Sequence, residues 1–396
     1  MDTGTAYGLP EPSYDADLVR VGPRTPGGEM LRRYWHPIAL STEAGGVPRK
    51  VRVLGEDLIL FRDGRGRPGL AYPRCCHRGT TLYYGKVERD GIRCCYHGWL
   101  FDPEGHCLDM PCEPPENNAS DRYRERVRQP WYPVAEYLGL VFAYLGPPEW
   151  KPVLPRYDVL DDVSPDEEVV ADGSNIGLAG PTTPCNWLQT HENVMDPFHV
   201  FVLHGTHSGN QFVPIMGLLP EVTWHHTSLG MKSYQDRRLD DGRLFHRVTE
   251  VVMPNVRIVA NPHVPRPGPS ESVAWTLAID DTTTKIYTLR RAPRGHRAER
   301  MGGNGKTWDE LTEEEHQRRP SDYEAQVGQG ASTCHSEEHL AATDRGVVMF
   351  RRRLREQIEA VRQGRDPLGV TRDPACALRH VEAGNFILEP GAAMSP

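Results

Sequence analysis

Two short segments that each combine cysteine with histidine constrain this chain more than any other feature of its sequence. The first is CCHRG at 75–79, and the second, sixteen residues beyond its histidine, is CCYHGW at 94–99. Each segment falls where a strand is expected to end in a tight turn, so two loops would present one thiolate and one imidazole each. Together they predict a metal centre. The four candidate ligands are Cys75, His77, Cys94 and His97.

Two kinds of centre use two cysteines and two histidines. A zinc site would place all four ligands on one ion, whereas a Rieske [2Fe–2S] cluster places both thiolates on one iron and both imidazoles on the other. Zinc fingers usually pair Cys with Cys and His with His along the chain. Here each loop carries one of each, which favours the cluster.

The residues around these ligands, His-Arg-Gly and Tyr-His-Gly-Trp, resemble the Rieske domain of Rieske non-haem iron oxygenases. One departure concerns the residue after each cysteine ligand. That position is usually proline in the family and is Cys76 or Cys95 here. We interpret both as packing residues, and we expect the other five cysteines to be small buried residues.

Composition limits the remaining possibilities. The 396 residues suffice for about two domains, and a net charge of −8 argues against a nucleic-acid partner. No apolar run is long enough for a membrane helix, and the N-terminus lacks the pattern of a signal peptide. Nine cysteines without an export signal suggest the reducing cytoplasm. The 38 glycines and 35 prolines favour a protein of many short strands and turns.

The order of patterns along the chain suggests three parts. Short β-patterns fill 47–145, and a Gly-Pro-Pro-rich stretch near 150 is interpreted as a linker. The second half combines an expected helix at 187–204, strands at 219–290, a surface loop at 294–320 and a strong amphipathic helix after Asp344. We therefore expect an N-terminal helical or extended segment packed on the catalytic domain at 1–45, a Rieske domain at 46–150 and a catalytic domain at 151–396.

A second group of candidate ligands lies within the expected helix, in the pattern D-x2-H-x4-H formed by Asp196, His199 and His204. Alone this spacing also fits surface or core histidines, but downstream of a Rieske motif the segment resembles the mononuclear-iron helix of the same oxygenases. On a regular helix His199 and His204 would lie about 140° apart, too far for one metal ion. We therefore predict a wide turn or π-bulge between them.

Three nearby residues are assigned other roles. Asp196 is badly placed on the helix to be a ligand but well placed to hydrogen-bond a ring N–H. The resemblance implies that its carboxylate bridges a mononuclear-site histidine to a Rieske histidine, His97 or His77, of a neighbouring subunit. His191 and His207 match no family position and are interpreted as non-ligands.

The third iron ligand should be a carboxylate from later in the chain, because non-haem Fe(II) oxygenases use two histidines and one carboxylate. Asp322 and Asp344 are the candidates. Asp344 begins the long helix and already has a role there as an N-terminal carboxylate. Counting back from Glu338, in a Glu-His-Leu resembling that of phthalate-dioxygenase-type enzymes, favours Asp322.

The resemblance covers nearly the whole chain and implies an α+β protein. Its parts would be an N-terminal Rieske β-domain and a C-terminal catalytic domain with helices on a curved antiparallel sheet, in a head-to-tail homotrimer. The implied protein is a terminal oxygenase that uses a [2Fe–2S] cluster, mononuclear Fe(II) and O2. Electrons would come from NAD(P)H through a separate reductase or ferredoxin, since the chain has no dinucleotide-binding signature. The alternative is a non-enzymatic Rieske electron carrier.

The resemblance to the phthalate-dioxygenase-like and aryl O-demethylase-like subgroup implies an aromatic substrate that carries a carboxylate. The outcome would be hydroxylation or O-demethylation. We expect the pocket walls to come from residues 251–260, around Met253 and Asn255, and from 271–279.

Overall fold

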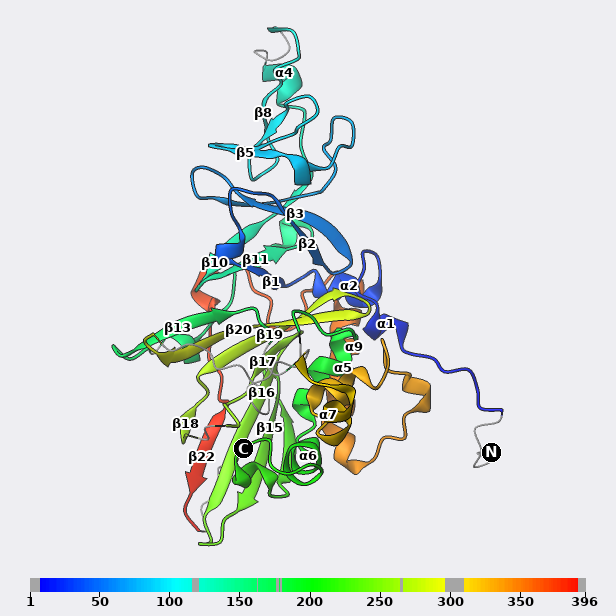
Figure 1. Cartoon of the computed structure of the whole chain (residues 1–396), viewed down its shortest axis with the longest axis vertical. Coiled ribbons are helices and arrows are strands. Elements are labelled where there is room, and N and C mark those ends of the chain that lie inside the picture. Colours follow the sequence, from blue (N-terminus) through cyan, green and yellow to red (C-terminus); the bar gives the residue numbers. More distant parts are fainter. Residues whose placement is uncertain are drawn as a thin grey trace.

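The computed structural model describes residues 8–115, 121–161, 163–175, 178, 180–263, 266–295 and 310–390. Its N-terminal half is built from small antiparallel sheets that carry the two cysteine–histidine loops, in the upper part of Figure 1. One sheet has the order β2(Arg49–Val53), β3(Glu56–Arg62), β4(Pro68–Ala71), β9(Trp131–Tyr132). A second has the order β5(Lys86–Glu88), β6(Gly91–Arg93), β7(Leu100–Phe101), β8(Cys107–Asp109). A third has the order β1(Trp35–Leu40), β11(Leu140–Tyr144), β10(Val134–Tyr137).

The hairpins of this half form where turn residues occur in the sequence. Asp63 follows β3, and its carboxylate accepts hydrogen bonds from the backbone N–H groups of Arg65 and Arg67, which closes the β3–β4 turn. Arg89 and Asp90 join β5 to β6. Each of the two turns thus falls at an Asp-Gly pair in the sequence, Asp63-Gly64 and Asp90-Gly91.

The C-terminal half is organised around one large, mostly antiparallel sheet, in the lower part of Figure 1. Its order is β13(Glu167–Asp172), β20(Thr283–Pro293), β19(Ser272–Asp280), β17(Val256–Ile258), β16(Leu244–Val252), β15(Gly230–Arg238), β14(Glu221–His226). Beside β16 lies β22(Gly384–Leu388), which also pairs with β18(Gly268–Pro269). A separate parallel pair joins β12(Arg156–Tyr157) to β21(Leu378–Arg379).

Helices gather along one side of this sheet (Figure 1). They include α1(Ala16–Val19), α2(Pro26–Leu31), α5(Trp187–Glu192), α6(Phe198–Phe201), α7(Glu313–Arg318), α8(Asp322–Val327) and α9(Arg345–Arg362), while α4(Asp121–Arg124) lies in the N-terminal half. The amphipathic pattern predicted α9, whose buried residues include Phe350, Leu354 and Ile358. Among the described residues, no helix has the length and apolar character that crossing a membrane requires. The α+β fold class is confirmed.

The N-terminal segment contacts both halves. Asp15 and Asp17 form ion pairs with Arg355 and Arg362 of α9, which ties the segment to the C-terminal half. In contrast, β1 pairs with β11 of the N-terminal half. A continuous hydrophobic core extends from these strands into the large sheet, so the two halves share one interior.

Residues 16–19 of the N-terminal segment, which was expected to be helical or extended, form the helix α1, and Asp15 caps it by accepting from the Asp17 N–H. Two other local expectations were wrong. The expected loop at 294–320 contains α7, which a capping box of Thr312 and Glu315 starts; residues 296–309 lie outside the described residues. The strand expected at 251–260 is interrupted after Val252 by a turn that contains Pro254.

Candidate metal centres

The first candidate centre is formed by two loops of nearly identical geometry. The Gly79 N–H donates to the Cys75 carbonyl at 2.8 Å, and the Gly98 N–H donates to the Cys94 carbonyl at 3.1 Å. Both glycines have positive φ, 79° and 74°, which side-chain-bearing residues rarely adopt. This explains the glycine that ends each loop motif, Cys-x-His-x-Gly in the first loop and Cys-x-x-His-Gly in the second.

The two loops bring their candidate ligands together. The rings of His77 and His97 lie 4.5 Å apart between centroids, and His77 also stacks on Trp99 at 4.2 Å. Cys75 and Cys94 are both buried, and burial raises the pKa of the Cys94 thiol. A buried thiolate pair needs a cation nearby, which a metal centre provides.

The spacing of these four residues separates the two metal hypotheses. Within the described part of the chain, only His199, His204 and Asp322 bring three ligand atoms within 4.8 Å of one another. The cysteine–histidine set is therefore more widely spread than four ligands of one tetrahedral zinc ion would be. Such a spread suits a two-iron cluster, with the thiolates and the imidazoles on different irons.

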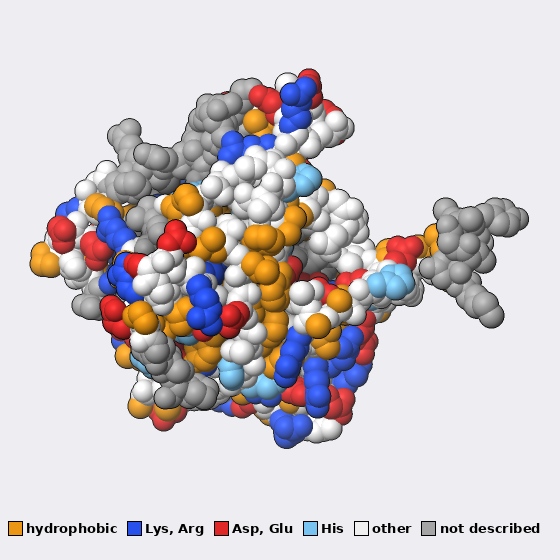
Figure 2. Space-filling model, turned by 90° about the horizontal axis from the view of Figure 1, so that it is seen from below, with side chains coloured by type: hydrophobic (Ala, Val, Ile, Leu, Met, Phe, Trp, Pro, Cys, Tyr) orange, Lys and Arg blue, Asp and Glu red, His pale blue; other side chains and the backbone are white. Residues whose placement is uncertain are grey.

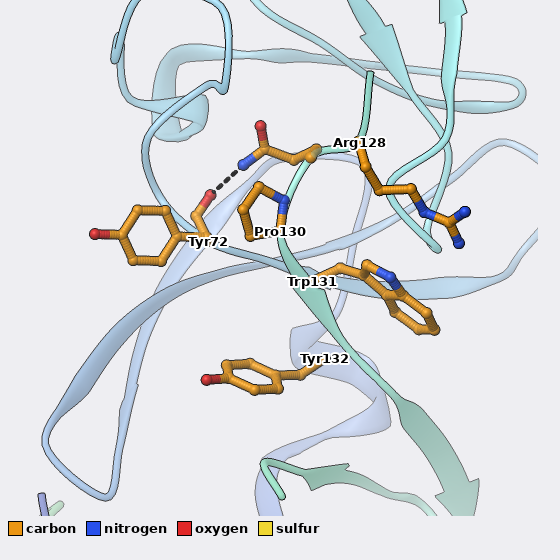
Figure 3. A pocket seen from close by; sticks show the side chains of 6 residues that line it. Tyr72, Arg128, Pro130, Trp131 and Tyr132 are labelled. Atoms are coloured by element: carbon orange, nitrogen blue, oxygen red, sulfur yellow. Dashed lines mark hydrogen bonds between the residues drawn. The ribbon is translucent and has the colours of Figure 1, made fainter. Parts of the chain in front are cut away.

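Behind the first loop, the buried side chain of Gln129 braces the backbone. Its Nε2 donates to the carbonyls of Tyr72 at 2.9 Å and Arg74 at 3.0 Å, and its Oε1 accepts from the Cys76 N–H at 2.8 Å. Gln129 lines a pocket of about 370 Å³, and Figure 3 shows Tyr72, Pro130 and Trp131 at the same pocket. The sequence alone gave no signal for this brace, because its partners lie more than fifty residues away.

The remaining cysteines correct part of our expectation. All nine are free thiols, and Cys107 and Cys185 are buried as predicted. Cys76 and Cys95, interpreted as packing residues, are exposed instead. Each loop turns its ligand cysteine inward, so the next side chain points outward. Among the other three, Cys334 is half-buried, and Cys112 and Cys376 are exposed.

The second candidate centre depends on an irregular helical segment. The helix expected at 187–204 is broken, because Pro197 separates the turn that ends at Met195 from α6. After α6 the chain forms a π-helix at Val202–Thr206, in which the His207 N–H donates to the Val202 carbonyl at 2.8 Å. The predicted π-bulge is confirmed. It brings the rings of His199 and His204 to 5.4 Å between centroids.

Asp322 completes a compact group with these histidines. One of its carboxylate oxygens lies 3.5 Å from His199 Nε2, and the other lies 3.4 Å from His204 Nε2. Asp322 is the first residue of α8, and the Asn193 side chain donates to its Oδ1 at 3.0 Å. By contrast, Asp344 lies at the start of α9, where its carboxylate accepts from the Ala341 N–H.

Both histidines are oriented by hydrogen bonds from their other ring nitrogen. His204 Nδ1 bonds to the side-chain oxygen of Gln211 at 3.0 Å, and His199 Nδ1 bonds to the Asp196 backbone carbonyl. These acceptors hold the proton on Nδ1, so each Nε2 is left with a lone pair directed at the group. His204 Nε2 is buried with no hydrogen-bond partner, as expected of an atom that binds a metal ion.

Charge stabilises this arrangement. Burial alone would raise the pKa of Asp322, but the neighbouring His204 and His199 outweigh it and hold that pKa below its usual value. Burial likewise opposes a proton on His199, yet Asp196 and Asp322 raise its pKa. A divalent cation would satisfy the same carboxylate–imidazole set with both rings neutral.

The other residues of this segment have separate environments. The Asp196 carboxylate lies 3.6 Å from His199 Nδ1 and is 28 % exposed, so it is near that ring but outside the ligand group. His191 is fully buried against Thr276, and burial lowers its pKa to about 3. His207 is exposed. Neither joins the group formed with Asp322.

Residues from both segments that were expected to form pocket walls, Met253, Asn255 and Trp275, line a small cavity together with Tyr34 and Trp35 of the N-terminal segment. Met253 belongs to the hydrophobic core, and the Asn255 side chain contacts His36 and the Thr276 carbonyl. Both therefore face the N-terminal segment. Arg257 of β17, two positions after Asn255, lies close enough to Asp322 for the carboxylate charge to raise its pKa.

Comparisons with known proteins agree with this arrangement. The Rieske [2Fe-2S] domain family matches residues 34–135. The α subunit of phenoxybenzoate dioxygenase from Ectopseudomonas oleovorans is 48 % identical over 97 % of this chain and 94 % of its own length. The oxygenase subunit of a tert-butanol monooxygenase / tert-amyl alcohol desaturase from Aquincola tertiaricarbonis is 37 % identical over 86 % and 76 %. Dicamba monooxygenase bound to dicamba shares the fold, with a TM-score of 0.59, 18 % identity and coverage of 84 % and 99 %.

Proposed function

The chain belongs to the Rieske aromatic oxygenases and is a terminal oxygenase subunit, and on that basis we propose that it oxidises an aromatic acid in aromatic-compound catabolism. O2 would be the co-substrate, and NAD(P)H would supply electrons through a separate reductase or ferredoxin. The single observation that carries the proposal is the preformed group of His199, His204 and Asp322, because an electron carrier has no use for it. The nine free thiols suit work in the reducing cytoplasm.

The residues present fit both metal groups. Cys75, Cys94, His77 and His97 would hold the [2Fe–2S] cluster, and the His199–His204–Asp322 group would hold Fe(II). When bound, the cluster would supply single electrons and the Fe(II) would activate O2. The chain's own contribution is to orient both imidazoles through their Nδ1 acceptors and to keep the carboxylate in place through Asn193.

We propose that Asp196 links two subunits. Its carboxylate is partly exposed beside His199, while the sheet of β5–β8, next to the cysteine–histidine loops, lies far from α6 along the long axis of the chain (Figure 1). Electron transfer between the two centres of the same chain would therefore have to cover a long distance. A head-to-tail homotrimer would instead bring the partner subunit's His97 or His77 to Asp196. The stripe of hydrophobic side chains on the face in Figure 2 offers a surface for such packing.

The substrate class follows from relatives and chemistry together. The relative with 48 % identity is named for phenoxybenzoate, which is an aromatic acid. The relative with 37 % identity is named for tertiary alcohols, which are uncharged. Hydroxylation and O-demethylation both remain compatible with one iron site of this kind. We favour an aromatic acid because the relative that is 48 % identical over 97 % of this chain is named for one.

The test is a screen of substrate-dependent O2 uptake with a surrogate reductase, using aromatic acids with and without methoxy groups. We expect uptake with at least one aromatic acid, and formaldehyde release would identify demethylation. The His199→Ala/His204→Ala double variant should keep the Rieske EPR signal and lose all turnover. Turnover by that variant would refute the assignment of the site.

A further inference from the structure

Three arginines line the face of the large sheet that meets the metal-ligand segment. This face is identified by Trp224, whose Nε1 donates to the Met195 carbonyl next to Asp196 at 3.0 Å. Side chains alternate along a strand, and antiparallel partners share a face. The register therefore places Arg237, Arg247 and Arg257 on the same side as Trp224. The pairs that establish it are Trp224 with Ser233, Gln235 with Arg247, and Val251 with Arg257.

Arg237 is fully buried and lacks partners for most of its guanidinium. Its Nε donates to the Leu218 carbonyl at 3.0 Å, but both terminal nitrogens are buried without any hydrogen bond. Burial lowers its pKa to about 10, and no neighbouring carboxylate offsets that effect. The side chain therefore remains charged at neutral pH. An unpaired buried cation is costly, so its retention points to a missing anionic partner.

Arg247 lies diagonally across from Arg237 and adds a second positive charge. Its terminal nitrogens donate to Asn385 Oδ1 at 2.8 Å and to the Ala260 carbonyl at 2.6 Å, so its position is fixed by neutral acceptors. Burial lowers its pKa to about 9, the charge of Arg237 also lowers it, and the charge of Glu271 partly opposes both effects. Among the residues that the structure describes, no carboxylate forms an ion pair with either arginine.

The arginine pair lies against the two segments that flank His204. Leu218, which accepts from Arg237, directly follows a short helix at Pro214–Gly217 that packs on the π-helix. Ala260, which accepts from Arg247, leads into the segment of His263. The His263 ring lies 5.0 Å from the Phe212 ring, which lies 4.3 Å from the His204 ring. Through these contacts both arginines connect to the segments that surround His204.

The charge of Asp322 raises the pKa of Arg257 and partly offsets the effect of burial, as the charge of Glu271 does for Arg247. Among the three arginines of this face, Arg237 is therefore the one whose charge no nearby carboxylate of the described residues offsets. Beside them, the Gln235 amide donates to Ser233 and Thr249 hydroxyls, which gives this part of the face a polar, uncharged lining.

We propose that Arg237, with Arg247 beside it, binds the carboxylate of the substrate. The proposal rests on the proposed function, since it requires an aromatic acid. The free edge of the Arg237 guanidinium offers two parallel N–H groups, which match the two oxygens of a carboxylate. A substrate held there by its acid group extends its ring toward His204. An uncharged analogue leaves the buried cation unpaired and binds more weakly.

The experiment compares 3-phenoxybenzoate with its carboxamide on the iron-loaded enzyme, by calorimetric titration and by ligand-induced shifts in Tm. In the wild type we expect the acid to bind about 100-fold more tightly than the amide. Arg237→Met should lower acid affinity about 100-fold and leave amide affinity unchanged. Arg237→Lys should recover only part of the preference, because an ammonium lacks the planar pair of donors.

The matched control is Arg238→Met, at the next position, on the opposite face and largely exposed, which should leave both affinities unchanged. Arg237→Met should also keep or raise the Tm of the ligand-free protein, since it removes an unpaired buried charge. Retained acid preference in that variant would overturn the proposal, and so would loss of folding, because both indicate a structural role. A wild type that binds no aromatic acid would instead refute the proposed substrate class.

Discussion

Replacing Gln211 with leucine tests how the mononuclear site is held. The Gln211 side chain accepts from His204 Nδ1 and donates to the carbonyls of Leu203 at 3.1 Å and Pro320 at 2.8 Å. Pro320 is two residues before Asp322, so one amide connects the π-helix to the segment that supplies the carboxylate. Leucine has a similar size and makes none of these bonds.

The expected effect follows from these contacts. Loss of the acceptor frees His204 to rotate and to carry its proton on either nitrogen, and changes of this kind weaken metal binding about 10- to 100-fold. The affinity of the mononuclear site for Fe(II) is measured by competition with a chelator, with the Rieske EPR signal as an internal standard. Gln317→Leu, an exposed glutamine on α7, is the control and should bind iron as the wild type does. Wild-type iron affinity in Gln211→Leu would refute the reasoning.

Three further predictions concern other parts of the chain. Asp322→Ala should lose the mononuclear iron, whereas Asp344→Ala should keep it and lose about 1 kcal/mol of stability; equal iron content in the two, measured by metal analysis, would contradict the ligand assignment. Gln129→Leu leaves the Tyr72 and Arg74 carbonyls and the Cys76 N–H without their side-chain partner, and should lower the free energy of unfolding by about 3 kcal/mol or more, measured by urea denaturation. An unchanged urea midpoint would show that the Gln129 hydrogen bonds do not stabilise the loop. Burial raises the pKa of Glu250 from 4.5 to about 7. Protonated Glu250 therefore contributes up to about 3 kcal/mol to the free energy of unfolding, fully below pH 4.5 and progressively less as the pH rises through 7. In Glu250→Gln the Tm should lose this dependence on pH, and an unchanged slope of Tm against pH would exclude Glu250 as its source.

The predictable parts of the site are those in which metal binding restricts the spacing of the ligands along the chain. His199 and His204 are five positions apart and cannot share a metal ion on a regular helix, so a π-turn was required, and it is present. Asp322 was chosen by counting back from Glu338. In the structure, Glu338 forms an ion pair with Arg351 of α9, and Arg351 also pairs with Glu192 of α5.

The parts that were missed depend on contacts between residues far apart in the sequence. Nothing in the pattern around Gln129 or Gln211 indicates that each amide joins separate segments, because glutamine is common at exposed positions. Arg237 lies in a strand whose alternation gives no sign that its guanidinium lacks a partner. Only the packed structure shows which polar groups have one.

Counting the metals of the purified chain tests the central claim most directly. Metal analysis with EPR of the reduced protein should find about three irons per chain, two of them in a Rieske cluster and one in a separate ferrous site. The His199→Ala/His204→Ala variant should retain two. Zinc at the cysteine–histidine loops, or only two irons in the wild type, would contradict the assignment of the two centres.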